Sequence, residues 1–191
     1  ETFLRCIRYN VLISLNKIEL TSSLLKFQSA LALHCFTNEY VYYQNDKETK
    51  LVEILENKIE NSLLKGIQPK STLVLCLASF KPLYQYKWSN LIKITTDINE
   101  VVTRQIREPK FEVQFKSDLP RLQKITNHIS SKVRDQYEDN PYPRWIHTGL
   151  SPKPAKFSEI NKNLGLRLFD KKILEIDAPK ILIAGCGTGQ Q

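Results

Sequence analysis

Apolar residues recur at steps of three and four through most of the first hundred residues, and this spacing constrains the fold more than any other feature. Such spacing collects the apolar side chains on one side of an α-helix. It predicts helices over residues 1–16, 24–43, 48–64 and 97–108. Residues 71–79 are so uniformly apolar that periodicity alone fits a buried helix or a strand, and we prefer a helix because the neighbouring segments are helical.

Residues that cap or break helices divide these segments. The run Thr21–Ser23 supplies an N-cap for the second helix, and Gly66 follows the third as a C-terminal cap. Thr95 or Thr96 is expected to begin the fourth helix. Pro109 is expected to stop it, because proline has no N–H and restricts the residue before it.

The second half of the chain contains more turn residues. Residues 111–115 alternate apolar and polar side chains but are too few for a firm strand assignment, and Pro120 is expected to open a helix over 121–137. Two prolines, Pro141 and Pro143, and two aromatics, Tyr142 and Trp145, then interrupt the helical pattern. A short helix and a connector are expected over 157–174.

The last residues have a different character. Pro179 precedes an apolar run, Ile181 to Ala184, and three glycines follow at alternate positions, Gly185, Gly187 and Gly189. A short apolar run between a proline and glycines is typical of a buried parallel strand. Glycines permit a tight turn and a close approach of backbone to ligand. We therefore expect half of a cofactor site here, since ligands of open α/β sheets bind at the carboxyl ends of strands.

The spacing of the glycines distinguishes between cofactors. A dinucleotide fold has the pattern G-x-G-x-x-G, whereas Gln190 occupies the position of its third glycine. The run Gly-Cys-Gly-Thr-Gly after Ile-Leu-Ile instead resembles the first motif of class I S-adenosylmethionine-dependent methyltransferases. Many of those enzymes have Asp or Glu two residues before the first glycine, where this chain has Ile183. That departure removes an acidic contact near the methionine end of the cofactor.

A second motif makes the resemblance more specific. Residues 133–145, Val-Arg-Asp-Gln-Tyr-Glu-Asp-Asn-Pro-Tyr-Pro-Arg-Trp, are similar to a bacterial methyltransferase family whose members often follow tetratricopeptide repeats. Residues 30–40 are similar to the helical region of that family. The resemblance implies a mainly α fold for this chain, with a helical N-terminal region leading into the first strand of a truncated Rossmann-like α/β domain. The expected parts are a helical region at 1–125 that could derive from repeats, a helix, aromatic loop and connector at 126–177, and the start of the catalytic domain at 178–191.

The resemblance also suggests how the aromatic loop would meet S-adenosylmethionine. Rings of Tyr137, Tyr142 and Trp145 could cover the sulfonium, since a cation is attracted to a ring face, and Arg144 could bind the cofactor carboxylate. The alternative, that the loop only packs the helical region against the catalytic domain, stays equally open. With Gly185, Gly187 and Gly189 these residues form the expected cofactor site. No metal site is expected.

The expected activity is transfer of a methyl group to an unknown acceptor, either a small molecule or a protein. The chain contains no methionine and stops at the glycine turn, so we expect a fragment, inactive alone, whose catalytic residues and ribose-binding acid lie beyond Gln191. One alternative is a helical protein–protein interaction module without catalytic activity. A nicotinamide-dependent oxidoreductase is disfavoured by Gln190. A DNA amino methyltransferase is rejected, because Asn140-Pro-Tyr-Pro follows a helix instead of a strand.

Composition narrows the functional classes further. The net charge of +8 comes from 28 basic and 20 acidic residues, but no run of five basic residues exists, so a nucleic-acid partner is unlikely. The four cysteines lack metal-ligand spacing and fit a cytoplasmic protein with reduced thiols. No apolar run is long enough to span a membrane. The polar set His34, Asn38 and Glu39 is interpreted as a hydrogen-bonded helix contact in preference to a binding site.

Overall fold

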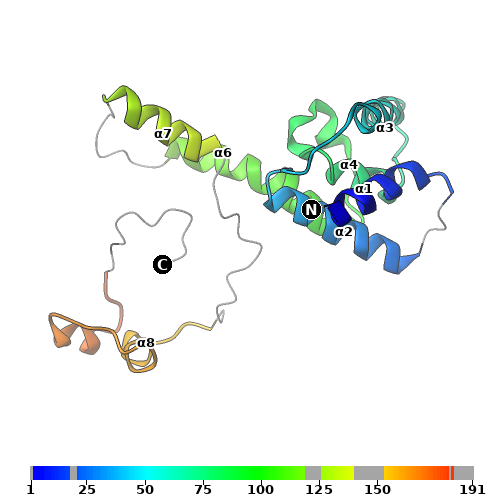
Figure 1. Cartoon of the computed structure of the whole chain (residues 1–191). Coiled ribbons are helices and arrows are strands. Elements are labelled where there is room, and N and C mark those ends of the chain that lie inside the picture. The colour runs from blue at the N-terminus through cyan, green and yellow to red at the C-terminus, as the bar shows by residue number, and fades with distance from the viewer. Residues whose placement is uncertain (1, 18–20, 119–125, 140–152, 181, 183–191) are drawn as a thin grey trace. The chain divides into compact units, whose positions relative to one another are not determined.

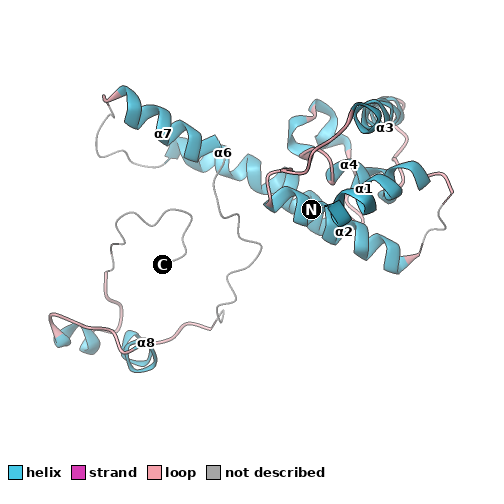
Figure 2. Cartoon of the chain, viewed as in Figure 1, coloured by secondary structure: helices cyan, strands magenta, loops and turns pink. Residues whose placement is uncertain are grey.

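A computed structural model describes residues 2–17, 21–118, 126–139, 153–180 and 182. The chain divides into two compact units, Glu1–Asn140 and Pro141–Gln191. The described ranges consist of helices joined by turns, and no strand occurs within them (Figure 2). The expectation of a mainly α chain is therefore confirmed for these residues.

The first unit begins with four α-helices and two short 3-10 helices. In chain order they are α1 (Thr2–Ser14), α2 (Ser22–Thr37), α3 (Asp46–Leu64), α4 (Ser71–Ala78), η1 (Leu83–Gln85) and η2 (Lys87–Leu91). Helices α1 and α3 fall where the apolar spacing predicts them, and α2 begins close to its expected start. Residues 71–79 are helical, as preferred, while the two 3-10 helices have no counterpart in the sequence pattern.

A longer helical run and a separate helix complete this unit, and two short elements form the described part of the second. They are α5 (Asn99–Val102), the π-helix η3 (Thr103–Arg107), α6 (Glu108–Asp118), α7 (His128–Asp139), α8 (Phe157–Leu164) and η4 (Lys171–Glu175). In the second unit α8 ends at Gly165, which has a φ of +60°. The expected short helix and connector over 157–174 is thus confirmed.

The core of the first unit is built around α4. Every residue of this helix from Thr72 to Ala78 is buried, and it packs against α1, α2 and α3 (Figure 1). A helix that is apolar on all sides is stable only when neighbours cover it all round. This explains why its sequence lacks the one-sided pattern of the other helices.

Local capping agrees with the sequence at several points. The hydroxyl of Thr21 accepts a hydrogen bond from the Leu24 N–H at 3.2 Å, as an N-cap should. Asn45 begins α3 with a reciprocal capping box, in which the Glu48 carboxylate accepts from the Asn45 N–H. Gly66 has a φ of +74° and follows α3 in the left-handed conformation expected of a terminal glycine.

The expected end of the second helix is wrong. The sequence predicts helix to residue 43, but α2 ends at Thr37, and Glu39 and Tyr40 have φ values of 51° and 52°. Tyr40 makes a long-range contact instead, in which its hydroxyl donates a hydrogen bond to the carbonyl of Ala78 at 3.0 Å. Tertiary hydrogen bonding therefore overrides the continuation of the helical pattern.

The expected limits of the fourth helix are also wrong. Neither Thr95 nor Thr96 caps it; Ile98 occupies the N-cap position without a side-chain hydrogen bond. The helix then continues through Pro109 to Asp118, so the alternating residues 111–115 are helical. The turn before the proline is a π turn, in which the Glu108 N–H bonds the Thr103 carbonyl. A change of hydrogen-bond register beside the proline lets the helix continue without the donor that proline lacks.

Two expectations fall partly outside the described residues. The helix expected over 121–137 begins only at His128, where Asn127 caps it by accepting from the N–H groups of Ile129 and Ser130. Residues 121–125 lie outside the described ranges. So does the strand expected over 181–184, except for Leu182, which is not in a strand. The Rossmann-like start of a domain at 178–191 therefore stays a prediction.

The side chain of Gln105 connects several core elements. It lies in the π turn, is fully buried, and donates from Nε2 to the carbonyls of Ala32 (3.2 Å) and Ala78 (3.1 Å). Its Oε1 accepts from the Leu83 N–H at 3.2 Å. One amide thus joins α2, α4 and η1 to η3 and satisfies backbone groups that no water reaches.

We expect Gln105→Leu to lower the free energy of unfolding by roughly 2–4 kcal/mol, because the Leu83 N–H would be buried without an acceptor. Urea denaturation followed by circular dichroism measures this change. Gln136→Leu, at an exposed position on α7, is the matched control and should change stability by about 0.5 kcal/mol or less. Equal effects of the two substitutions would contradict the role assigned to Gln105.

Candidate functional site

The most unusual polar feature of the described residues is the buried side chain of Arg8. It is 2% exposed and lies on the same face of α1 as the core residues Val11 and Leu12. Its Nη2 donates to the backbone carbonyls of Tyr42 (3.4 Å) and Tyr43 (3.3 Å). Among the described residues no ion pair with a carboxylate compensates this charge, so backbone dipoles and aromatic rings must stabilise it.

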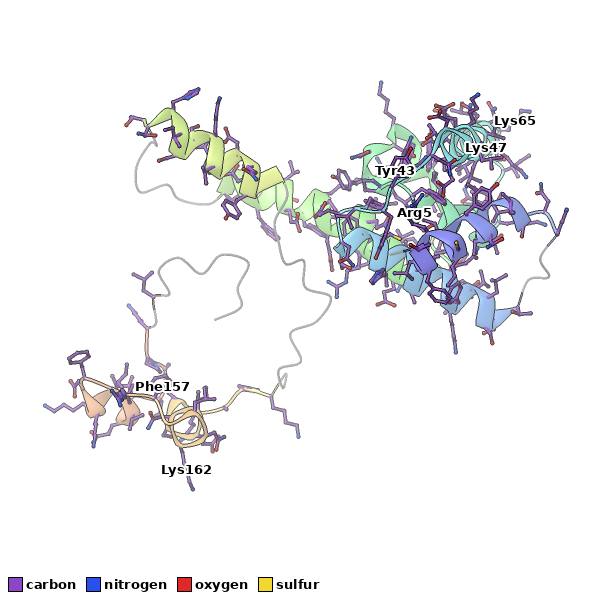
Figure 3. The ribbon with its side chains drawn as sticks, viewed as in Figure 1. Arg5, Tyr43, Lys47, Lys65, Phe157 and Lys162 are labelled. Atoms are coloured by element: carbon purple, nitrogen blue, oxygen red, sulfur yellow. The ribbon has the colours of Figure 1, made fainter. Side chains whose placement is uncertain are left out.

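Aromatic rings surround the two arginines of α1. The guanidinium carbon of Arg8 lies 4.3 Å from the ring centroid of Phe80 and 5.8 Å from that of Tyr42. Arg5, one turn earlier, lies 5.1 Å from the ring centroid of Tyr43 and donates to the Tyr43 carbonyl at 3.2 Å (Figure 3). Cation–π contacts and carbonyl acceptors together hold the segment that follows α2.

The polar residues at the end of α2 bond within this cluster. The Nε2 of His34 and the hydroxyl of Tyr42 are 2.6 Å apart, and their rings stack. Asn38 donates from its amide to the carbonyl of His34 at 2.8 Å. The interpretation of His34 and Asn38 as a hydrogen-bonded helix contact is therefore confirmed. These contacts fix the left-handed turn at Glu39 and Tyr40.

The charge of Arg8 acts on two buried thiols, those of Cys35 and Cys76. Burial raises the pKa of Cys35 to about 11 and that of Cys76 to about 12, while the Arg8 charge opposes both shifts. Both groups are therefore protonated near neutral pH, and the thiolate required for nucleophilic chemistry is absent. The described part of the chain also lacks any group of three potential metal ligands. The contacts of Arg8 thus anchor the turn that follows α2.

Most of the cofactor site expected from the sequence lies outside the described residues. This applies to Gly185, Gly187, Gly189, Tyr142, Arg144 and Trp145. Tyr137 is described; it lies on α7 and is 67% exposed. Ile129 and Val133 precede it at steps of four and are exposed as well. The described structure therefore brings no two of the expected site residues together.

The sequence does contain a signal for the Arg8 cluster, although the pattern analysis overlooks it. Arg8 precedes Val11 by three residues and Leu12 by four, so it interrupts the apolar face of the first helix. A charged residue at such a position must be paired, solvated by backbone groups or exposed at the rim. The partners on the following turn are distant in sequence, and no local pattern identifies them.

We expect Cys6 to react with a maleimide in the native protein while Cys35 and Cys76 do not, because Cys6 is the exposed one of these three described cysteines. A Cys186→Ser background and mass spectrometry of the peptides identify the labelled thiols. Rapid native labelling of Cys35 at pH 7 would contradict its burial.

The free energy of unfolding should fall as the pH rises from about 9 toward 11. In this range the thiol of Cys35 loses its proton in the unfolded chain but keeps it in the folded one, because burial raises its pKa.

Comparison with known proteins adds no relative. No family model matches the chain, and no curated protein and no solved structure matches it significantly. No helix among the described residues is both long enough and apolar enough to cross a membrane. A functional assignment therefore depends on the residues of the chain itself.

Proposed function

We propose that the chain is part of an S-adenosylmethionine-dependent methyltransferase. The observation that carries the proposal is the run Ile181 to Gly189, an apolar segment followed by three glycines at alternate positions. Because glycine has no Cβ, the backbone of this run can approach a bulky cofactor closely, and the backbone N–H groups can then bind polar atoms of the ligand. Gln190 in place of a third dinucleotide glycine favours this cofactor over a nicotinamide.

The aromatic loop supports the same assignment. It lies about forty residues before the glycine run, and its rings are of the type that attracts a sulfonium cation. Tyr137 stands at the entrance of this loop with its ring largely exposed on α7. Tyr142 and Trp145 would contribute further rings, and Arg144 would supply a charge-assisted hydrogen bond to the cofactor carboxylate.

The chemistry of methyl transfer places limited demands on the protein. The bound cofactor supplies an activated methyl group, which passes from sulfur to a lone pair of the acceptor in a single in-line displacement. The contribution of this chain would be to bind the cofactor through its glycine turn and to exclude water with its aromatic loop. Catalysis would arise mainly from the orientation of the two reactants. A general base for the acceptor proton is not assigned among the residues present.

We infer a cytoplasmic protein that acts on a small molecule or on another protein. A nucleic-acid acceptor is disfavoured because the 28 basic residues are dispersed along the chain. The helical N-terminal region, which could derive from repeats, would offer a surface for a protein partner. It would precede a Rossmann-like catalytic domain that begins with the apolar run Ile181 to Ala184.

A second candidate function is a helical protein–protein interaction module. It is favoured by a groove of about 230 Å³ between α1 and α3. The groove is lined by seven aliphatic side chains and two polar ones: Leu12, Ile13, Leu15, Leu51, Ile54, Leu55, Leu73, Asn16 and Lys58. Ile13 and Ile54 are exposed, and an apolar groove between two helices is typical of surfaces that receive a third helix. Thermal denaturation of the complete protein with S-adenosylhomocysteine distinguishes the candidates, because only a methyltransferase should be stabilised.

We expect Gly187→Ala to abolish binding of S-adenosylmethionine by the complete protein. An added methyl group would occupy space needed by the cofactor or force a strained backbone. Isothermal titration calorimetry measures the affinity, and circular dichroism establishes that the fold is retained. Gly149→Ala, at a glycine outside the motif, is the control and should bind normally. Unchanged affinity of the folded Gly187→Ala variant would refute the assigned site.

A separate prediction concerns the aromatic loop. Replacing the ring that covers the sulfonium by leucine, at Tyr137, Tyr142 or Trp145, should weaken S-adenosylmethionine more than S-adenosylhomocysteine. Only the former carries the charge, and a cation over a ring contributes roughly 0.5–2 kcal/mol. The ratio of the two affinities is the measured quantity, with Tyr84→Leu on η1 as a control. If all three loop variants keep the parent ratio, the loop serves only to join the two regions.

A further inference from the structure

The helical run from Asn99 to Asp118 changes its environment abruptly near its middle. Val101, Val102, Gln105 and Ile106 are buried, with Gln105 hydrogen-bonded to three core elements. From Phe111 onward every side chain whose exposure is described is exposed. One half of the run therefore belongs to the core of the first unit, and the other half projects from it.

Two weaknesses in the backbone coincide with this change. The π turn Thr103–Arg107 ends with the Glu108 N–H bonded to the Thr103 carbonyl, five residues back instead of four. The next residue is Pro109, which has no N–H to donate. Prolines and π turns are both recognised causes of a kink in a helix, and π turns are frequent at functional sites.

Two polar side-chain contacts lie beside this junction among the described residues, and both are weak. Arg104 and Glu108 form an ion pair at 2.9 Å, but both side chains are partly exposed, and such pairs contribute little to stability. Lys110 contacts the Asn90 side chain of η2. Neither contact has the apolar burial that holds α5 in the core, so water can replace both at small cost.

We propose that the Glu108–Pro109 step is a hinge about which α6 swings as a rigid lever while α5 and η3 stay fixed. The hydrogen bonds of the buried Gln105 amide hold the residues before the hinge in the core. Pro109 has no N–H, so the helix has one backbone hydrogen bond fewer at the hinge. At the far end of α6, Lys116 forms an ion pair with Glu138 of α7 at 2.5 Å; this pair is more exposed than Arg104–Glu108 and couples the two helices only weakly. This inference does not depend on the proposed methyltransferase activity.

Pairs of spin labels on the full chain test the hinge by pulsed electron paramagnetic resonance. Cys6→Ser and Cys186→Ser remove the exposed thiol and the one outside the described residues, while the buried Cys35 and Cys76 remain. One label pair joins Glu60→Cys on α3 to Glu112→Cys on α6. The control pair joins Glu60→Cys to Glu100→Cys on α5, on the fixed side of the hinge. All three labelled positions are exposed.

A hinge predicts a broad distance distribution for the 60–112 pair and a narrow one for the 60–100 pair. Pro109→Ala restores a backbone donor and should narrow the 60–112 distribution to the width of the control pair, leaving the control unchanged. Equal widths of the two pairs in the parent protein would overturn the proposal, and so would a 60–112 distribution that stays broad in Pro109→Ala. The parent comparison decides the matter even if that variant folds poorly.

Discussion

The architecture of the first unit depends on the hydrogen bonding of its buried central helix. Because α4 is apolar on every side, it can be covered all round, but its terminal carbonyls then lose access to water. The carbonyl of Ala78 accepts from both the Tyr40 hydroxyl and the Gln105 amide. Two side chains from distant segments thus meet at one backbone oxygen. The left-handed turn after α2 and the π turn of η3 are the backbone adjustments that bring them there.

The same unit tolerates a buried cation through a comparable arrangement. The guanidinium of Arg8 is solvated by the carbonyls of Tyr42 and Tyr43 and by the face of the Phe80 ring. Burial of a charge is costly, so the segment that supplies these groups must be held in one conformation. Arg5 and the contact between His34 and Tyr42 provide that restraint. The charged cluster therefore stabilises a turn, while burial keeps the nearby thiols protonated near neutral pH against the opposing charge of Arg8.

The proposed chemistry and the described structure belong to different parts of the chain. The helical unit supplies a firm core, an apolar groove between α1 and α3, and a weakly restrained arm formed by α6 and α7. The residues expected to bind the cofactor follow that arm in sequence.

The sequence by itself determined the presence and type of the main helices, because apolar spacing and capping residues act within a few positions of the chain. Thr21 and Gly66 are examples whose roles follow from local geometry. Only the tertiary structure decided that α2 stops at Thr37, that the helix continues through Pro109, and that Arg8 is buried. Each of those outcomes depends on a partner more than twenty residues away or on a change in hydrogen-bond register, and neither has a local signature. The proposed cofactor site depends on the glycine spacing and the aromatic loop in the sequence, because most of its residues lie outside the described ranges.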